Sequence, residues 1–512
     1  MKPSRRKLLV GGLGGSVVAA AAFAGCGETQ IVTQEVVKVV TQQVPVEKVV
    51  TKIVKEQVAV EVEKVVTQEV ERVVTQIVEK EKVVEKVVEK IVTVEAMAPK
   101  PENVEIIYWT WLAPQLRLGF GPFDEWLRGE FTKRNPHIKV DVAFLPFGEL
   151  LTKTIASLAG GAAPDALHSS VFHARDLYDK GALTELNDWL KPYPERSMEN
   201  YVAIASIFNQ FKGNIYGLPG EADLDCRTHN VHHLEEAGID PDPVALNSWT
   251  REDAVENALK LTLRDGDKIT RSGWVANNIR HQQLCGYCYA DGLDSIYIEE
   301  GRALNPKFRE LGPPAFQFEY DMLHVHNVSK PITPDRTDRP DFFNGLNSSV
   351  YMSVADIQEF TKQVGGRFPF EMVHVPRGPN WKDLQGTFWN NMMVVPVKGP
   401  SPEAGFEFAS WYASEEGAIA RIDLTGMPSS HLGLFRSPQW QVHKGISVQY
   451  GNFFEVLRGP ETAGPYPYVR SAGFNSSTAA AGQGVNLGEL TPEEAIDRIF
   501  EESIEFLEDV PA

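Results

Sequence analysis

Cysteine is scarce in this sequence, with four residues among 512. Cys26 directly follows an N-terminal apolar segment, so only Cys226, Cys285 and Cys288 remain for the folded part of the chain. Small secreted domains that rely on disulfides carry several cysteine pairs. The sequence therefore excludes a disulfide scaffold, and its hydrophobic content of 43% instead predicts a fold held by an apolar core.

Basic residues are also few, and outside the extreme N-terminus they form no cluster. The 50 lysines and arginines are outnumbered by 69 aspartates and glutamates, which gives a formal net charge of -19. Proteins that bind nucleic acid or anionic lipid neutralise phosphates with lysine and arginine. We therefore expect neither nucleic acid nor an anionic lipid surface as a partner.

Long apolar runs are rare, and one extends from Leu8 to Ala24 after a basic start. Such a run is typical of an export signal that is later removed. The order Ser4-Arg5-Arg6-Lys7-Leu8 resembles a twin-arginine signal, and Phe23-Ala24-Gly25-Cys26 resembles the lipobox of bacterial lipoproteins. We predict that residues 1–26 are a signal peptide and that a lipid on Cys26 anchors the chain on the extracytoplasmic face of the cell membrane. The export route, twin-arginine or general secretion, stays open.

Residues 27–100 nearly lack glycine, proline and aromatic side chains, and they consist of short units such as Val-Val-Thr-Gln and Glu-Lys-Val-Val. Such low-complexity sequence supplies no large side chains from which to build a core. The pairs Val83-Val84, Val87-Val88 and Ile91-Val92 recur every four residues, close to a helical period. A helical stalk and a disordered linker both stay open, and in either case we interpret the segment as a spacer.

From residue 101 onward the chain alternates segments typical of strands and of helices. We predict strands at 104–109 and 138–142, helices at about 123–133 and 150–159, and a further strand that opens at 164–167. Strand–helix alternation is typical of an α/β domain with a largely parallel sheet. Ligands of such sheets bind at the carboxyl ends of the strands, so we expect a binding site there.

Several short segments of this region follow one another in a fixed order. They are Phe131–Val140 (FTKRNPHIKV), Gly160–Ala166 (GGAAPDA), Gly181–Leu186 (GALTEL), Gly213–Pro219 (GNIYGLP), Asn230, Ala237–Ile239 (AGI), Trp249-Thr250, Gly386–Trp389 (GTFW) and Gly426–Pro428 (GMP). In order and spacing these segments resemble the family-one extracellular solute-binding proteins, the group that includes the maltodextrin-binding proteins. The resemblance extends from about Val104 to the C-terminus.

This resemblance implies a two-lobed α/β fold with hinge segments that cross between the lobes. It further implies that a solute is captured between the lobes and passed to the permease subunits of an ABC importer in the membrane. Lobe 1 would comprise about 101–220 and 330–385, and lobe 2 about 223–328 and 387–512. The implied solute is a carbohydrate, first of all an oligosaccharide, and neither a cofactor nor a metal is expected.

Sugars present apolar ring faces and rings of hydroxyl groups, so their sites combine aromatic side chains with carboxylates and amides. In this chain such side chains follow predicted strand ends or lie in the implied crossing segments. The candidate ligand-binding residues are Trp109, Trp111, Ser169, Ser170, Glu221, Asp223, Trp274, Tyr351, Trp389 and Asn390. We interpret Trp126, Trp189, Trp249 and Trp411 instead as packing residues, because they lie at helical spacing among apolar residues.

One group of cysteine and histidine residues supports a different class of protein. Cys285-Gly286-Tyr287-Cys288, with His281 nearby, could bind a metal, although one Cys-x-x-Cys without a second is weak and favours packed thiols or a local disulfide. The alternative is therefore an exported metal-dependent hydrolase that acts on carbohydrate or another extracellular substrate. The sequence contains no HExxH, G-x-S-x-G or phosphate-loop motif, so we predict that the chain is not an enzyme.

A phosphate-bearing solute would need a positive site, for which Arg227 is the candidate.

Overall fold

The computed structural model divides the chain into two compact units, residues 1–102 and residues 103–512. The described residues are 103–276, 281–331, 338–378, 380, 387–443, 464–465 and 469–510, together with six short strands between 36 and 90. These six strands form three antiparallel pairs: β1 (Val36–Val39) with β2 (Ile53–Glu56), β3 (Val58–Val62) with β4 (Lys64–Gln68), and β5 (Glu71–Glu79) with β6 (Lys82–Lys90). The described part of the predicted spacer is therefore extended, and its spacer role stays a prediction. Cys26 and the predicted signal peptide lie outside the described residues.

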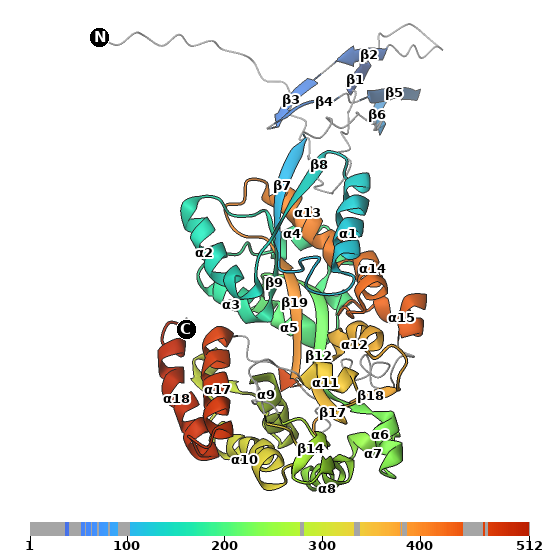
Figure 1. Ribbon diagram of the computed structural model, residues 1–512. Coiled ribbons are helices and arrows are strands. Elements are labelled where there is room, and N and C mark those ends of the chain that lie inside the picture. Colours follow the sequence, from blue (N-terminus) through green and yellow to red (C-terminus); the bar gives the residue numbers. More distant parts are fainter. Residues whose placement is uncertain are drawn as a thin grey trace, which may run out of the picture. The chain divides into compact units, whose positions relative to one another are not determined.

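An eight-stranded sheet runs through the second unit (Figure 1). Its strands are β7 (Val104–Thr110), β8 (Ile138–Phe144), β9 (Ala166–Ser170), β12 (Leu218–Asn230), β17 (Ser349–Ser353), β18 (Phe370–Val373), β19 (Thr387–Val394) and β20 (Gly464–Pro465). The order is β17-β12-β19-β9-β7-β8, with β18 also paired to β12 and β20 to β19. The strands predicted at 104–109 and 138–142 are confirmed as β7 and β8, and the third begins at Ala166.

The prediction of a largely parallel sheet holds for the first three strands and for the short pair β19–β20, but not for the remaining pairs. β7 pairs in parallel with β8 and β9, whereas β19 is antiparallel to β9, and β12 is antiparallel to β17, β18 and β19. β12 and β19 are the two strands that carry the chain from one half of the sheet to the other and back. Because they run in opposite directions, their pairing is antiparallel.

The first lobe surrounds β7, β8 and β9. Its helices are α1 (Phe120–Arg134), α2 (Leu150–Gly160), α3 (Val171–Asp179), α4 (Asn187–Leu190), α5 (Ala203–Phe208), α13 (Pro402–Ala413), α14 (Glu415–Thr425) and α15 (Pro438–His443), with the hairpin β10 (Gln210–Phe211) and β11 (Asn214–Ile215). α1 presents Phe120, Phe123, Leu127 and Phe131 at helical spacing, and all four are buried against the sheet. The predicted helices at 123–133 and 150–159 are confirmed.

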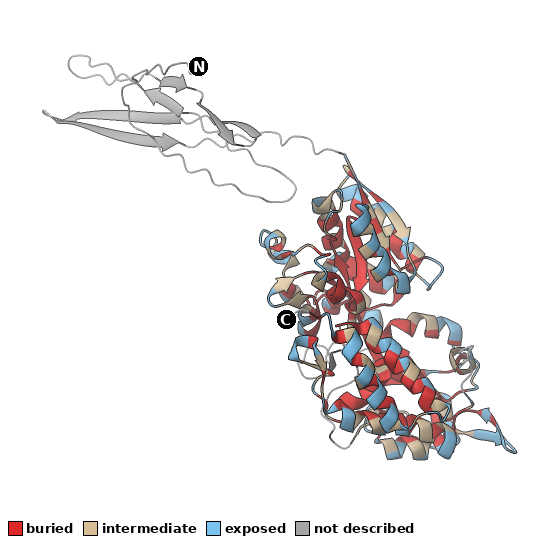
Figure 2. Cartoon of the chain, turned by 90° about the vertical axis from the view of Figure 1, so that its left-hand side faces the viewer, coloured by how far each residue is buried: buried red, intermediate tan, exposed pale blue. Residues whose placement is uncertain are grey.

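The second lobe is mainly helical and encloses its own core, seen as the buried interior of the lower half in Figure 2. Its helices are α6 (Val231–Glu236), α7 (Pro243–Asn247), α8 (Arg251–Leu261), α9 (His281–Ala290), α10 (Phe308–Tyr320), α17 (Ser471–Asn486) and α18 (Pro492–Leu507). The helices α11 (Asp338–Phe343) and α12 (Ile357–Val364) instead bury Phe342, Ile357 and Phe360 in a core shared with Leu167 of β9. Short hairpins add β13 (Leu263–Asp265) to β14 (Lys268–Arg271) and β15 (Tyr297–Ile298) to β16 (Ala303–Leu304). Among the described residues, no helix is long and apolar enough to span a bilayer.

The lobe boundaries implied by the resemblance need a correction. Residues 387–512 were expected in lobe 2, yet Met393 of β19 and Phe408 of α13 are buried in the core around Tyr108 of β7. In the segment 330–385, expected in lobe 1, residues such as Phe342, Ile357 and Phe360 share a core with Leu167 and Val171 of the first lobe, whereas Val373 and Val375 are buried in the core of the second lobe. The physical reason is that the chain returns through β19 to the first lobe before it enters the second lobe again at α17.

Candidate functional site

The candidate site is assembled where the two crossing strands meet the end of β9. Along the antiparallel pair β12–β19, Asp223 lies opposite Trp389 and Ala222 opposite Asn390. On the other side of β19, Asn391 lies opposite Ser170, the last residue of β9. Sequence reasoning placed Asp223 and Trp389 in different crossing segments, and the structure makes those segments neighbouring strands.

Two partly exposed indoles border this region. Trp111 stacks on His168, with ring centroids 5.7 Å apart and an interplanar angle of 16°, and meets Phe147 edge-on. Trp389 tilts against Phe172 at 5.7 Å. Within the described part of the chain, Nε1 of Trp111 and Nε1 of Trp389 are buried without a hydrogen-bond partner. A buried donor without an acceptor is costly, so both N–H groups suit a ligand oxygen. Trp109, also partly exposed, packs against the adjacent core.

Asp223, opposite Trp389 on the neighbouring strand, is fully buried. Its Oδ1 accepts the backbone N–H of Ala355, at 3.1 Å, in the short helix η6 (Val354–Asp356). Burial, with the nearby Asp356 adding to it, raises the pKa of Asp223 to about 7. Burial and the charge of Asp223 likewise raise the pKa of Asp225 well above its usual range. Two carboxyl groups that resist ionisation can both donate and accept hydrogen bonds at neutral pH.

A pocket of about 670 Å³ opens beside this carboxyl cluster. Its lining comprises Arg117, Asp338, Arg339, Pro340, Phe343, Asn344, Glu359, Gln363 and Arg367. Arg117, and Arg339 of α11, both bind Asp356, at 3.0 Å and 2.7 Å. Although burial opposes ionisation of Asp356, these two guanidinium groups outweigh it and lower the pKa of that carboxyl.

Glu221, two residues before Asp223, has a different environment. Its carboxylate accepts hydrogen bonds from Tyr412 and from Nε2 of His168 at 2.9 Å, and it pairs with Nε of Arg421 at 3.0 Å. Burial alone would raise the pKa of Glu221, but Arg421 and His168 outweigh it and hold the pKa well below its usual range. Sequence reasoning counted Glu221 as a ligand group. In the structure its oxygens are engaged by protein groups, and through His168 it supports the ring of Trp111.

Four further candidates are polar or aromatic residues that the structure buries. The hydroxyls of Ser169 and Ser170 have no partner among the described residues, and Nδ2 of Asn390 donates to the carbonyl of Asn391. Tyr351, 6% exposed, packs in the second lobe and hydrogen-bonds Asp225. These groups therefore lie beside the site or support it.

Trp274 and Arg227 lie inside the second lobe. The indole of Trp274 is 1% exposed, and its Nε1 donates to Oε2 of Glu319 at 3.3 Å. The guanidinium of Arg227 lies 3.6 Å from the Trp274 ring centroid and pairs with Glu319 at 3.4 Å. The structure thus does not bring Trp274 together with Trp111 and Trp389, and the charge of Arg227 is already neutralised.

Sequence reasoning missed the aromatic contact between the lobes. Phe172, in the first turn of α3, meets His281, the first residue of α9, edge-on at 6.1 Å. Burial lowers the pKa of His281 to about 3, so its ring is neutral. In the sequence, His281 stands out only as a neighbour of the cysteines. The signal that could have pointed to this contact is that His281 begins a helix, as Phe172 does after the strand-end serines.

The cysteine cluster is apolar packing. Cys226, Cys285 and Cys288 are buried free thiols, so of the two accounts left open, packed thiols are confirmed and a local disulfide is not formed. Among the described residues, no group of three or more histidine, cysteine, aspartate or glutamate side chains is placed to hold a metal ion. The expected packing of Trp126 is also confirmed, since it stacks on Trp411 at 5.4 Å.

The two-lobed α/β fold with crossing strands is the fold of the periplasmic solute-binding proteins. Residues 113–287 match the family model of the bacterial extracellular solute-binding proteins, which confirms the resemblance drawn from the sequence. No curated protein sequence matches the chain at a significant level.

Three solved structures illustrate the likeness of the fold. An ABC substrate-binding protein from Listeria monocytogenes, in complex with cycloalternan, is 20% identical, with a TM-score of 0.64 over 79% of this chain and 99% of that chain. The GacH receptor of Streptomyces glaucescens, solved unliganded and with acarbose, is 16% identical, with a TM-score of 0.66 over 80% and 100%. A maltose/maltodextrin-binding domain from Bdellovibrio bacteriovorus, bound to maltotriose, is 16% identical, with a TM-score of 0.64 over 78% and 99%. At these identities the likeness establishes the fold.

Proposed function

We propose that this chain is the solute-binding receptor of an ABC importer and that it captures a carbohydrate between its two lobes. The observation that carries the proposal is the pair of partly exposed indoles, Trp111 and Trp389, beside the buried carboxyl of Asp223. Aromatic faces fit the apolar face of a sugar ring, while the indole N–H groups and the carboxyl fit its hydroxyls. The three similar structures described above were solved with oligosaccharide-type ligands, which supports the same class of solute here.

Within this site we assign direct ligand contact to Trp109, Trp111, Asp223 and Trp389. Glu221 is a supporting residue. Carbohydrate is favoured over a phosphate-bearing solute because Arg227, the cation nearest to Asp223 along β12, is paired with Glu319. One similar structure, from Mycobacterium tuberculosis, contains glycerophosphocholine, so this phosphodiester belongs in the test as a competing candidate.

The decisive experiment is a thermal-shift screen of the purified chain. Maltotriose, mannotriose, acarbose, cycloalternan, single sugars and glycerophosphocholine are each added in excess, and a ligand that binds the native state raises the unfolding temperature. We expect a rise with at least one oligosaccharide and none with glycerophosphocholine. Stabilisation by the phosphodiester alone would contradict the proposed solute class.

The chain is proposed to bind without turnover. The comparisons give no support to the alternative, a metal-dependent hydrolase, because the matched family consists of binding proteins. Incubation with the stabilising oligosaccharide should therefore release no shorter sugar, as judged by mass spectrometry. A product that forms with time and disappears with a chelator would favour the hydrolase.

The same proposal places the receptor outside the cytoplasm. The matched family is extracellular, and the sequence adds the predicted lipid on Cys26. Mass spectrometry of membrane fractions should find a diacylglycerol-modified Cys26 at the N-terminus of the mature chain. A soluble chain with a different N-terminus would contradict the anchor while leaving the binding function intact.

A further inference from the structure

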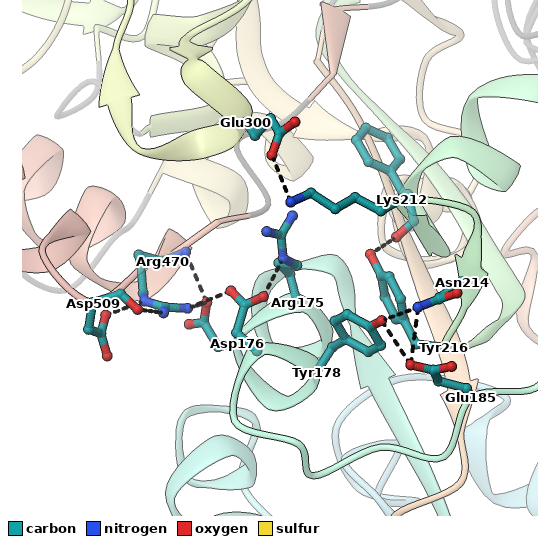
Figure 3. A network of polar contacts seen from close by, with 12 residues as sticks. Arg175, Asp176, Tyr178, Glu185, Lys212, Asn214, Tyr216, Glu300, Arg470 and Asp509 are labelled. Atoms are coloured by element: carbon teal, nitrogen blue, oxygen red, sulfur yellow. Dashed lines mark hydrogen bonds and ion pairs between the residues drawn. The ribbon is translucent and has the colours of Figure 1, made fainter. Parts of the chain in front are cut away.

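One set of ion pairs joins the two lobes at a distance from Asp223 (Figure 3). Arg470, immediately before α17 of the second lobe, reaches α3 of the first lobe. Its Nη1 lies 2.8 Å from Oδ1 of Asp176 and 3.2 Å from Oδ2 of Asp179, and its backbone N–H donates to the same Oδ1 of Asp176 at 3.0 Å. Its Nε pairs with Asp509 at 2.8 Å, which fixes the guanidinium in its own lobe.

A second ion pair crosses the lobes nearby. Lys212, in the turn of the β10–β11 hairpin of the first lobe, lies 3.3 Å from Glu300 of the second lobe. Both side chains are about half exposed, at 48% and 51%, so this pair is weaker than the buried contact of Arg470 with Asp176, which are 9% and 4% exposed.

Each lobe links its two contact points internally. In the first lobe, Arg175 pairs with Asp179 at 2.8 Å and lies over the ring of Phe211 at 3.3 Å, which ties α3 to the hairpin that carries Lys212. In the second lobe, Tyr297 donates to the carbonyl of Val469 at 2.7 Å. Gly301, at φ +96°, leaves no room for a side chain because its Cβ would lie 2.6 Å from Val469.

Three residues at these contacts have a left-handed backbone conformation. Lys212, Glu300 and Arg470 all have positive φ, at 49°, 58° and 48°, although none is glycine. Such a conformation costs free energy and persists where the surrounding contacts hold it. Three of the five charged residues in these cross-lobe contacts therefore adopt a backbone conformation that their surroundings must hold.

We propose that Arg470 and Glu300, with Asp176, Asp179 and Lys212, form a latch that holds the two lobes closed. The latch touches the proposed site through α3. Ser471, next to Arg470, donates its hydroxyl to the carbonyl of Phe172 at 2.5 Å, and Phe172 is the residue that packs against Trp389. Arg470 is thus a positioning residue for solute retention, an inference that rests on the proposed function. The latch populates the closed arrangement before a solute binds and slows the departure of a bound one.

The test measures lobe separation directly. Spin labels are placed on Lys153→Cys in α2 and Lys260→Cys in α8, which are both exposed and lie in different lobes, in the full chain with Cys26→Ser. The remaining cysteines are buried. Without solute, the distance distribution should contain a closed population, and Arg470→Ala should convert most of it into a longer-distance population. Arg470→Lys should retain part of it, because lysine keeps the charge but not the fork.

Matched variants separate the latch from a local structural role. Arg498→Ala removes an exposed arginine that pairs with Glu502 on the same helix, and it should leave the distribution unchanged. Asp176→Asn approaches the same contact from the first lobe and should also open the lobes, whereas Lys212→Ala should shift the distribution less. With a solute found by the screen, Arg470→Ala should raise the dissociation rate roughly tenfold or more.

The inference is overturned if the wild type shows only the open distance, or if Arg470→Ala and Asp176→Asn both match Arg498→Ala. The labels report lobe separation without any solute. A carbohydrate screen that fails would therefore contradict the proposed function and leave this measurement to decide the latch.

Discussion

Two carboxylates on one strand, Glu221 and Asp223, differ more in environment than in position. Glu221 lies among Arg421, His168 and Tyr412, which bind both of its oxygens and keep it ionised. Asp223 lies between two other carboxyl groups, Asp225 and Asp356, and its pKa is raised to about 7. The comparison teaches that a buried carboxylate surrounded by cations supports the fold, whereas Asp223, with carboxyl neighbours and an Oδ2 without a partner among the described residues, is the one that our proposal assigns to a ligand.

The largest expected effect comes from breaking the supported carboxylate. Glu221→Ala should lower the free energy of unfolding by about 3–5 kcal/mol, because the buried guanidinium of Arg421 then loses its counter-charge. Urea denaturation of the two chains measures the difference. Glu221→Gln, which keeps the shape and part of the hydrogen bonding, should cost less. A loss below about 1 kcal/mol for Glu221→Ala would show that Arg421 finds another partner.

The second prediction concerns pH. The pKa of Asp223 rises from 3.8 in the unfolded chain to about 7 in the fold, so between these values the native state holds a proton that the unfolded state lacks. Its contribution to stability is therefore complete below about pH 4 and is lost as the pH rises through 7, by up to about 1.4 kcal/mol per pH unit.

The measurement is the difference in unfolding free energy between the wild type and Asp223→Asn from pH 4 to pH 8. Asp223 interacts with Asp225 on its own strand and with Asp356 and Arg117 on other segments. These groups are present in both chains, so much of their contribution to the difference in unfolding free energy cancels. The advantage of the wild type should shrink as the pH rises. An advantage that grows with pH would mean that Asp223 is stabilised as a carboxylate, as Glu221 is.

The third prediction turns from stability to binding. Asp223→Ala should weaken binding of the carbohydrate found by the screen by roughly 1.5–3 kcal/mol, since it removes a buried partner of the hydroxyl groups. Isothermal titration calorimetry measures the change, and Asp267→Ala, at an exposed hairpin turn, is the control. Equal affinity of the two variants would remove Asp223 from the site.

The alternation of strands and helices in the first lobe could be predicted because β7, β8, α1 and α2 are short, locally patterned elements. For β12, the sequence could not show which residues face a ligand and which belong to the core. All thirteen residues of this strand are buried, so no alternation separates core from ligand positions. Tyr412 and Arg421, which bind Glu221, also lie far along the chain from it, in α13 and α14.

Lobe membership was equally hidden from the sequence. The chain first crosses between the lobes through β12, which is buried from end to end, and the contacts of Arg470 with α3 join residues almost 300 positions apart. The segment resemblance located the crossing strands, because it depends on motifs, but it did not show which core each later segment enters.

The smallest effect is expected where an aromatic residue supports the fold at a distance from the carboxyl cluster. Trp126 of α1 stacks on Trp411 of α13 at 5.4 Å and on Phe123 at 6.2 Å, and it is partly exposed. Trp126→Ala should therefore lower the free energy of unfolding by about 1–2 kcal/mol through lost packing. Carbohydrate affinity should stay within about twofold of the wild type. Trp389→Ala is the matched comparison, since its indole packs against Phe172 beside Asp223, and it should weaken binding with little dependence on salt. If Trp126→Ala weakened binding as much as Trp389→Ala, the packing between α1 and α13 would have to affect carbohydrate affinity. The distinction between supporting and ligand-binding residues would then fail for the aromatic side chains.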